Sequence, residues 1–161
     1  MDYTFREMRQ NDKEKMWAFY AGLGEESTAF FNVDHGNENR TMDFFSSPRP
    51  NHRYFVAEIG NEIAGHLFLW DTDTAVPWLG IAVRDDFQGQ GVGTRMLLSL
   101  FVLLTDEGYG GLLLRTAQTN TAAQRLYEKC GFQRLGTHPS GEYLYLKRFL
   151  KDEETHDESD R

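Results

Sequence analysis

The chain has 161 residues, of which 40% are hydrophobic and 14% aromatic, enough for one domain with a sizeable core and too many for general disorder. Its formal net charge of −8 argues against a nucleic-acid partner, because binding to a phosphate backbone requires clustered lysines and arginines. The single cysteine, Cys130, excludes an internal disulfide and a cysteine-based metal cluster, which fits a reducing compartment.

Neither a targeting signal nor a membrane span is evident in the sequence. The first residues, MDYTFREMRQ, lack the apolar core of a signal peptide, and no apolar run approaches the ~18 residues of a membrane span. We therefore expect a cytoplasmic protein with no membrane partner and no bound metal. From Lys151 onward the chain is almost wholly polar, so we expect one domain over residues 1–150 and a disordered acidic tail over residues 151–161.

The first half of the chain predicts strands on either side of an irregular region. Residues 3–8 predict a short strand, and a helix follows whose start is marked by a cap-like pair, Asn11 and Glu14. Residues 22–45 are aromatic but irregular, which leaves helix and loop open. Two strands joined by a Gly60-Asn61 turn come next, and then the strand WLGIAV, whose beginning Pro77 marks.

A glycine-rich loop, FQGQGVG over residues 87–93, precedes a long helix in the second half. The helix is predicted by apolar residues that recur at helical spacing and define a buried stripe: Val92, Met96, Leu97, Leu100, Phe101 and Leu104. Glycines let main-chain N–H groups approach a ligand closely, and the start of a helix favours negative charge. The loop therefore predicts a site for an anion, typically a phosphate.

The remaining elements complete a mixed sheet. An apolar strand, LLLRTA, is followed by a helix that runs from a cap at Asn120 to a stop at Gly131. Two aromatic-rich strands then close the domain around a turn at residues 139–141. This order predicts an α/β fold with a mixed central sheet and one strand–helix–strand crossover in its second half.

Three phosphate-binding designs compete for the loop. A P-loop fails, because Gly93 is followed by Thr94 and Arg95 rather than by Lys and Ser or Thr. A dinucleotide fingerprint is weak, since the register that starts at Gly89 ends on Thr94 and no acid closes the next strand. The pattern Gln/Arg-x-x-Gly-x-Gly/Ala fits in register, with Gln88, Gly91 and Gly93 at its defined positions.

The stretch LGIAVRDDFQGQGVGTRMLL, together with RTAQTNTAAQRLYEKCGF further on, resembles the acetyl-coenzyme A binding core of the GNAT N-acetyltransferase superfamily. The resemblance covers residues 79–132, about a third of the chain. It implies a GNAT-like acyl-CoA N-acyltransferase fold, in which two neighbouring strands of the central sheet splay apart, helices flank the sheet and the acetyl-CoA co-substrate lies in the gap.

The resemblance also implies roles for individual residues. The main chain of Ile81, Ala82 and Val83 would face the pantetheine arm, as in strand pairing. Gln88 begins the motif, Arg95 adds a positive charge nearby, and N–H groups of the loop would hold the pyrophosphate: Gly89, Gln90, Gly91, Val92, Gly93 and Thr94. Asn120 matches the family asparagine that touches the cofactor arm.

Tyr127 matches the family tyrosine whose hydroxyl faces the thioester sulfur. In direct transfer an amine attacks the thioester carbonyl and a thiolate departs, so a neutral tyrosine hydroxyl can protonate the leaving group. A main-chain N–H from the GIAV strand would stabilise the oxyanion. Two plainer interpretations remain: Tyr127 as a core aromatic, and Asn120 as nothing more than a helix cap.

The general base and the acceptor stay open. Some relatives that acetylate protein N-termini carry a Glu on the strand before the asparagine, whereas this chain has Leu114, Arg115 and Thr116 there, which argues against an N-terminal acetylase. A chain of water molecules is one candidate for the base, and the others are Glu25, Glu26, Glu58, His66, Asp71 and Asp73. The acceptor side is expected to include Phe30, Phe31, Trp78 and Tyr143, unless these aromatics only fill the core.

We expect an acetyl-CoA-dependent N-acetyltransferase whose partner is a small cationic amine, with a homodimer as an open alternative. A lysine side chain or a protein N-terminus is the second acceptor class. Two further alternatives are a non-catalytic acyl-CoA binding module of the same fold and a nucleotide-binding protein that uses the glycine loop.

Overall fold

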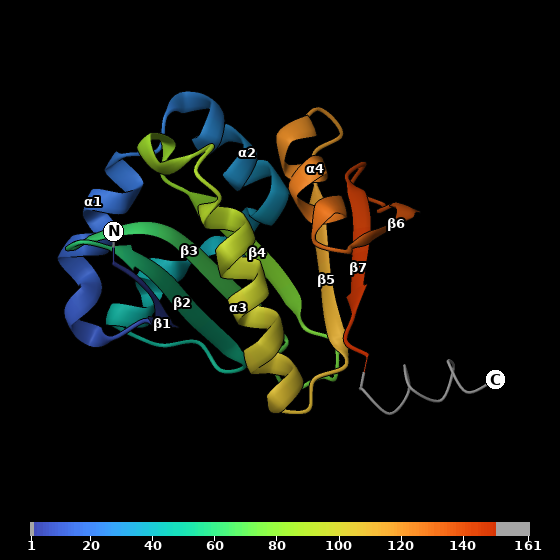
Figure 1. Cartoon of the computed structure of the whole chain (residues 1–161), viewed down its shortest axis with the longest axis horizontal. Helices are drawn as coiled ribbons and strands as arrows, with labels where there is room; N and C mark the ends of the chain where they lie inside the picture. The colour runs from blue at the N-terminus through green and yellow to red at the C-terminus, as the bar shows by residue number, and fades with distance from the viewer. Residues whose placement is uncertain (1, 151–161) are drawn as a thin grey trace.

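The computed structural model describes residues 2–150, so the predicted acidic tail lies outside the described residues. The strands form one seven-stranded sheet in the order β1-β2-β3-β4-β5-β7-β6 (Figure 1). Neighbouring strands are antiparallel except β4 and β5, which are parallel. The strand bounds are β1 Tyr3–Glu7, β2 His52–Ile59, β3 Glu62–Trp70, β4 Trp78–Val83, β5 Gly111–Thr116, β6 Gln133–Thr137 and β7 Tyr143–Arg148.

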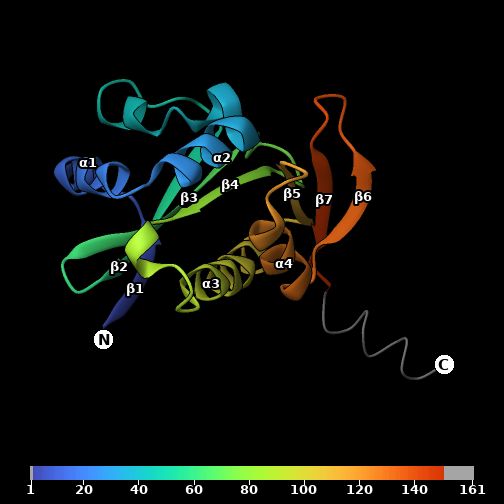
Figure 2. The same ribbon diagram turned by 90° about the horizontal axis from the view of Figure 1, so that it is seen from above.

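Helices cover both faces of the sheet. Figure 2 shows α1 (Lys13–Ala21) and α2 (Glu25–His35) over one face, and α3 (Val92–Asp106) and α4 (Thr121–Lys129) over the other. The predicted stripe of α3 is buried throughout, because it packs on β3 and β4. None of the described helices is both long enough and apolar enough to cross a membrane.

The predicted crossover is present, and it produces the expected splayed strands. The chain leaves β4, runs through α3 and returns in β5, so β4 and β5 lie side by side and parallel. Within the described residues their register contains a single pair, Trp78 with Leu113, and the two strands then diverge (Figure 1). The β5-facing edge of β4 beyond Trp78 therefore lies outside the strand ladder.

The sequence and the structure differ at the start of α1. The predicted cap pair, Asn11 and Glu14, is wrong: Asn11 is exposed, and a 3₁₀ turn over Gln10–Asp12 precedes the helix. Asp12 is buried instead, where its carboxylate accepts the N–H of Arg9 at 2.7 Å and pairs with Arg6 at 2.9 Å. The buried ion pair and the turn together take the place of the expected cap.

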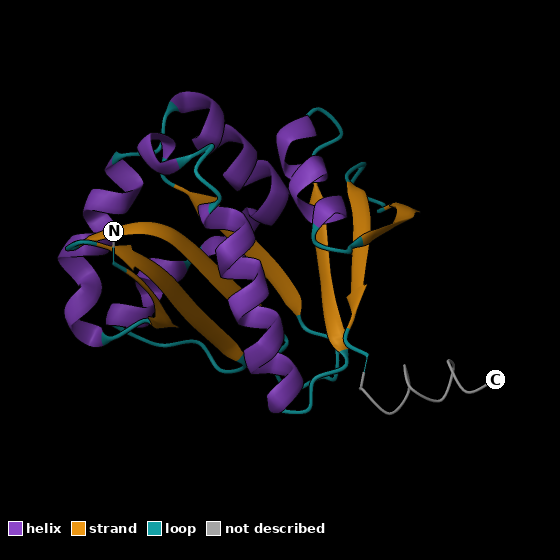
Figure 3. Cartoon of the chain, in the orientation of Figure 1, coloured by secondary structure: helices purple, strands orange, loops and turns teal. Residues whose placement is uncertain are grey.

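The irregular region over residues 22–45 folds as helix. It contains α2 and two 3₁₀ helices, Gly36–Asn39 and Thr41–Phe45, all coloured as helix in Figure 3. Its aromatic side chains pack with the core on the α1 and α2 side of the sheet, where Phe31 contacts Phe68 at a ring distance of 6.0 Å. Tertiary packing of these aromatics explains a helix that sequence periodicity leaves undecided.

Candidate active site

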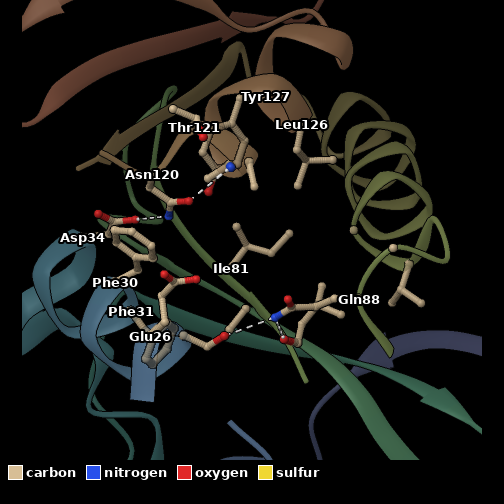
Figure 4. A pocket seen from close by; sticks show the side chains of 18 of the residues that line it. Glu26, Phe30, Phe31, Asp34, Ile81, Gln88, Asn120, Thr121, Leu126 and Tyr127 are labelled. Atoms are coloured by element: carbon tan, nitrogen blue, oxygen red, sulfur yellow. Dashed lines mark hydrogen bonds between the residues drawn. The ribbon is translucent and has the colours of Figure 1, made fainter. Parts of the chain in front are cut away.

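A cavity of about 630 Å³ lies where β4 and β5 diverge, between α2, the glycine loop and α4 (Figure 4). Its lining brings together almost all of the predicted site residues: Ile81, Ala82, Val83, Gln88, Gly89, Gly91, Val92, Gly93, Thr94, Asn120 and Tyr127. Gln90 is the exception, and its side-chain amide donates to the carbonyl of Asp86 at 3.1 Å. Arg95 also lies outside the lining, with its guanidinium 3.8 Å from the centre of the Tyr3 ring.

The glycine loop needs glycine for its backbone conformation. Gly89 and Gly91 have φ angles of 76° and 80°, in the left-handed region that side chains disfavour. Gly91 is also the N-cap residue of α3, and no side chain caps the helix there. The first residues of this 15-residue helix line the cavity, and their N–H groups have no side-chain cap, an arrangement that suits an anion.

Gln88 fastens the loop to the surrounding elements. Its side-chain amide donates to the carbonyl of Val83 at 2.9 Å and to the hydroxyl of Ser27 at 3.2 Å. The first contact fixes the end of β4, and the second reaches α2 on the other wall of the cavity. Gln88 is therefore a bridge between two walls, a role that its motif position alone does not reveal.

Asn120 caps α4, as the sequence predicts. Its side-chain oxygen accepts the N–H of Ala123 at 3.2 Å, and its amide nitrogen lies 3.5 Å from a carboxylate oxygen of Asp34 (Figure 4). The cap positions the first turn of α4 at the cavity, where Thr121 and Ala123 also line the wall.

Tyr127 follows on the same helix and is 3% exposed. Its ring packs against Phe132 and Tyr145 at ring distances of 5.6 and 5.9 Å. Burial raises the pKa of the Tyr127 hydroxyl well above its usual range, and the charge of Asp34 raises it further. The hydroxyl is therefore neutral at pH 7 and able to donate a proton.

Asp34 is the site residue that the sequence reasoning missed. It lies on α2, is 4% exposed and lines the cavity (Figure 4). Its carboxylate accepts the N–H of Ala117 at 2.7 Å and the hydroxyl of Thr116 at 2.9 Å. Burial raises the pKa of this carboxyl to about 6, although the two hydrogen bonds act to lower it.

One pattern in the sequence points to Asp34 in retrospect. Glu26, Phe30 and Asp34 are spaced four residues apart, so they share one face of a helix, and all three line the cavity. The spacing carries information only once residues 25–35 are known to be helical.

A sequence model of the acetyltransferase (GNAT) family matches residues 20–132, which contain the glycine loop, Asn120 and Tyr127. The chain belongs to this family. A curated relative, the putative [ribosomal protein bS18]-alanine N-acetyltransferase of Bacillus subtilis, is 29% identical over 84 residues, 52% of this chain and 56% of the relative. The match with this chain covers between 26% and 56% of the length of the curated relatives.

Solved structures show the same GNAT fold. The GNAT domain of S. lividans PAT has a TM-score of 0.77 at 14% identity, with 89% of each chain covered. The PaiA N-acetyltransferase of Thermoplasma acidophilum, solved in complex with coenzyme A, has a TM-score of 0.71 at 17% identity and covers 92% of this chain and 100% of that one. At these identities the likeness concerns the fold alone.

Two of the base candidates lie away from the cavity of this GNAT fold. Glu58 is held in ion pairs with Arg6 at 2.9 Å and Lys15 at 2.8 Å. His66 is fully buried, where its Nδ1–H donates to the carbonyl of Phe55 at 2.8 Å and its Nε2 accepts the hydroxyl of Thr41 at 2.9 Å. Burial lowers the pKa of His66 to about 4, so this imidazole is a neutral core group.

Of the remaining base candidates, one lines the larger cavity and the other three lie outside it. Asp71 lies in the turn after β3 with a φ of 57°, and Asp73 lines a separate hollow of about 340 Å³. Glu25 is exposed and outside the lining of the larger cavity, whereas Glu26 is part of that lining. Of the candidates named from the sequence, Glu26 is the one that the fold brings to the cavity.

Of the four aromatic residues expected at the acceptor, two line the cavity and two lie outside it. Phe30 and Phe31 line the cavity. Trp78 instead stacks on Trp70 at a ring distance of 6.0 Å, and Tyr143 lies under the guanidinium of Arg134 at 4.0 Å. The sheet thus uses Trp78 and Tyr143 for packing outside the cavity, while α2 contributes the aromatic wall.

Proposed function

We propose that this chain transfers the acetyl group of acetyl-CoA to a primary amine by direct attack. The observation that carries the proposal is that one cavity, where β4 and β5 diverge, is lined both by the glycine loop and by α4 with Asn120 and Tyr127. A loop that binds phosphate and a strand edge without a neighbour together suit a ligand with a pyrophosphate and an amide-containing arm.

Different residues would bind different parts of acetyl-CoA. N–H groups from Gly89 to Thr94 would hold the pyrophosphate at the start of α3, where the helix dipole favours negative charge. The edge of β4 at residues 81–83 lies outside the strand ladder, and its groups that Gln88 does not occupy would pair with the pantetheine amides. Asn120 would keep the opening turn of α4 against the arm.

Tyr127 would act as the general acid. Its buried hydroxyl remains protonated at neutral pH, because the cavity wall and the nearby Asp34 carboxylate both disfavour the phenolate. A proton donor at this position would stabilise the departing thiolate, and a main-chain N–H of β4 would stabilise the oxyanion.

The acceptor that we favour is a small cationic amine. Glu26, Asp34 and Phe30 line one wall of the cavity, and carboxylates beside an aromatic ring suit an ammonium group. A protein N-terminus is the second candidate, supported by the Bacillus subtilis relative, which is named as a putative alanine N-acetyltransferase of ribosomal protein bS18.

A ligand and acceptor screen tests the proposal. Thermal shift with acetyl-CoA, ATP and NAD, measured side by side, should show stabilisation by acetyl-CoA. Release of free thiol should then be followed with small amines, lysine derivatives and a peptide that begins with alanine. Stabilisation by ATP or NAD alone would overturn the proposal. Tight acetyl-CoA binding without thiol release for any acceptor would instead identify a non-catalytic binding module.

A further inference from the structure

We infer that Asp34 takes the proton from the ammonium group of the acceptor, so that the free amine can attack the thioester. This inference rests on the proposed acetyltransferase function. Asp34 stands on α2, outside the stretch that carries the acetyl-CoA motif, and it reaches the cavity beside Asn120, the cap of α4 (Figure 4).

The position of Asp34 is determined by the end of β5. Thr116 is the last residue of this strand and Ala117 follows it, and both donate to the Asp34 carboxylate. The strand itself offers Leu114, Arg115 and Thr116 before the helix cap and therefore no acid. Two hydrogen bonds thus hold a carboxylate from α2 at the end of β5, and β5 itself has no carboxylate there.

The Asp34 carboxylate can still accept a further hydrogen bond, from a substrate. Its contacts with Thr116, Ala117 and Asn120 use three donors, the last at 3.5 Å, while a carboxylate offers about four acceptor sites. Because Asp34 lines the cavity, the remaining acceptor site can face an entering ammonium group. The two short hydrogen bonds hold the oxygen atoms in place, so binding requires no rearrangement of Asp34.

Asp34 and Tyr127 line the same cavity and have complementary protonation states. Both side chains line the cavity, and burial together with the charge of Asp34 raises the pKa of the Tyr127 hydroxyl. At neutral pH the Asp34 carboxylate is free to accept a proton while Tyr127 still carries the proton that it donates to the thiolate, so the two residues suit the roles of base and acid at the same pH.

The charged groups around Asp34 support a base that works near neutral pH. Glu142, which precedes β7, raises the pKa of Asp34, in addition to the larger effect of burial. Arg115 on β5 lies 3.9 Å from Glu142 and 3.8 Å from Glu38, so it is shared between two other carboxylates. The neighbouring His35 is uncharged, because burial lowers its pKa to about 3. With a pKa of about 6, Asp34 is ionised at pH 7 and still basic enough to accept a proton.

The protons and bonds of the step balance. The Asp34 carboxylate accepts one proton from the ammonium group, and the amine nitrogen then bonds to the thioester carbonyl carbon. When the C–S bond breaks, the thiolate takes the proton of Tyr127, and the nitrogen of the new amide returns a proton to the Tyr127 oxygen. Asp34 finally releases its proton to water, so one ammonium and one thioester give one amide, one thiol and one proton.

The first test compares Asp34→Asn with the parent protein in single-turnover acetylation of an amine found in the acceptor screen, from pH 5 to pH 9. The asparagine can still accept from Ala117 and donate to the Thr116 hydroxyl, so the fold should survive. We expect the variant to bind acetyl-CoA normally in thermal shift and to lose about 10²- to 10⁴-fold in rate at pH 7. The fall of the parent rate below pH about 6 should be absent from the variant. Glu25→Gln removes an exposed charge from the same helix outside the cavity, and should keep the parent rate and pH profile.

A second variant tests the assignment without removing the carboxylate. Thr116→Val keeps the shape of a fully buried side chain and deletes a hydrogen bond that lowers the pKa of Asp34. The acidic limb of the rate profile should therefore move to higher pH. This measurement decides the question even if Asp34→Asn does not fold.

Each result has one meaning. Loss of rate in Asp34→Asn with retained acetyl-CoA binding, or an upward shift of the limb in Thr116→Val, supports the inference. A parent-like rate and limb in a folded Asp34→Asn protein, or an unmoved limb in Thr116→Val, assigns the base to another group. A parent protein that acetylates no amine overturns the proposed function and this inference together, whereas failure of the inference alone leaves the parent active.

Discussion

The carboxylate of Asp34 accepts the backbone N–H of Ala117 at 2.7 Å, although the two residues are 83 positions apart in the sequence. This hydrogen bond joins α2 to the chain immediately beyond β5, at the place where β4 and β5 have diverged. It therefore closes one wall of the cavity and puts a buried acid beside the cap of α4.

Gly91→Val should abolish acetyl-CoA binding while the domain still folds. A side chain at this φ of 80° is strained and would project from the cavity wall, so main-chain N–H groups could no longer reach a phosphate. Gly60→Val is the matched control, since Gly60 has a φ of 64°, open space around it and a place in the distant β2–β3 turn. Both variants should lose about 1–3 kcal/mol of stability, and titration calorimetry should show lost binding in Gly91→Val alone. Equal affinity in the two folded variants would remove the loop from the site.

Tyr127→Phe should lower the single-turnover rate by about 10²- to 10⁴-fold while stability and acetyl-CoA affinity change little. The phenyl ring keeps the contacts with Phe132 and Tyr145, so the substitution deletes the proton donor alone. Single-turnover measurement is required because product release can hide a chemical effect on kcat. A rate within a few-fold of the parent protein would make Tyr127 a packing residue and water the proton source.

The contribution of Asp34 to the free energy of unfolding should fall as pH rises through its pKa. The folded pKa of about 6 lies above the ordinary value of 3.8, so the folded state binds this proton more tightly than the unfolded state does. The resulting stabilisation is complete below pH about 4 and is lost as pH rises through about 6. Relative to Asp34→Asn, the parent protein should therefore lose at most about 3 kcal/mol between pH 4 and pH 7. Urea unfolding of both proteins at several pH values measures this difference, in which all other carboxyl groups cancel, and a constant difference would contradict the raised pKa.

Asn120→Ala should destabilise the protein by about 1 kcal/mol, because the N–H of Ala123 loses its side-chain acceptor at the start of α4. Asn120→Ser restores an acceptor and should recover most of that stability, while its short side chain no longer approaches Asp34. If the serine variant recovers stability but binds acetyl-CoA more weakly than the parent protein, Asn120 contacts the ligand in addition to capping the helix. Parent-like affinity in Asn120→Ser would limit Asn120 to the cap.

The order of strands and helices and most of the cavity lining follow from the sequence by itself. Gly89 and Gly91 signal a left-handed backbone, the stripe from Val92 to Leu104 signals a buried helix face, and Asn120 signals a cap. These signals are local, since each depends on the conformational limits of one residue or on a short period along the chain.

The tertiary structure alone decided which acid reaches the cavity. The helical state of residues 25–35 depends on packing against the sheet rather than on periodicity, and the sequence pattern there left helix and loop open. Glu58 and His66 appear suitable in the sequence, yet ion pairing holds one and burial neutralises the other. Asp34 meets Thr116 across 82 positions of chain, and such a contact is set by how the helix and the sheet dock, because hydrogen bonding and desolvation depend on three-dimensional neighbours.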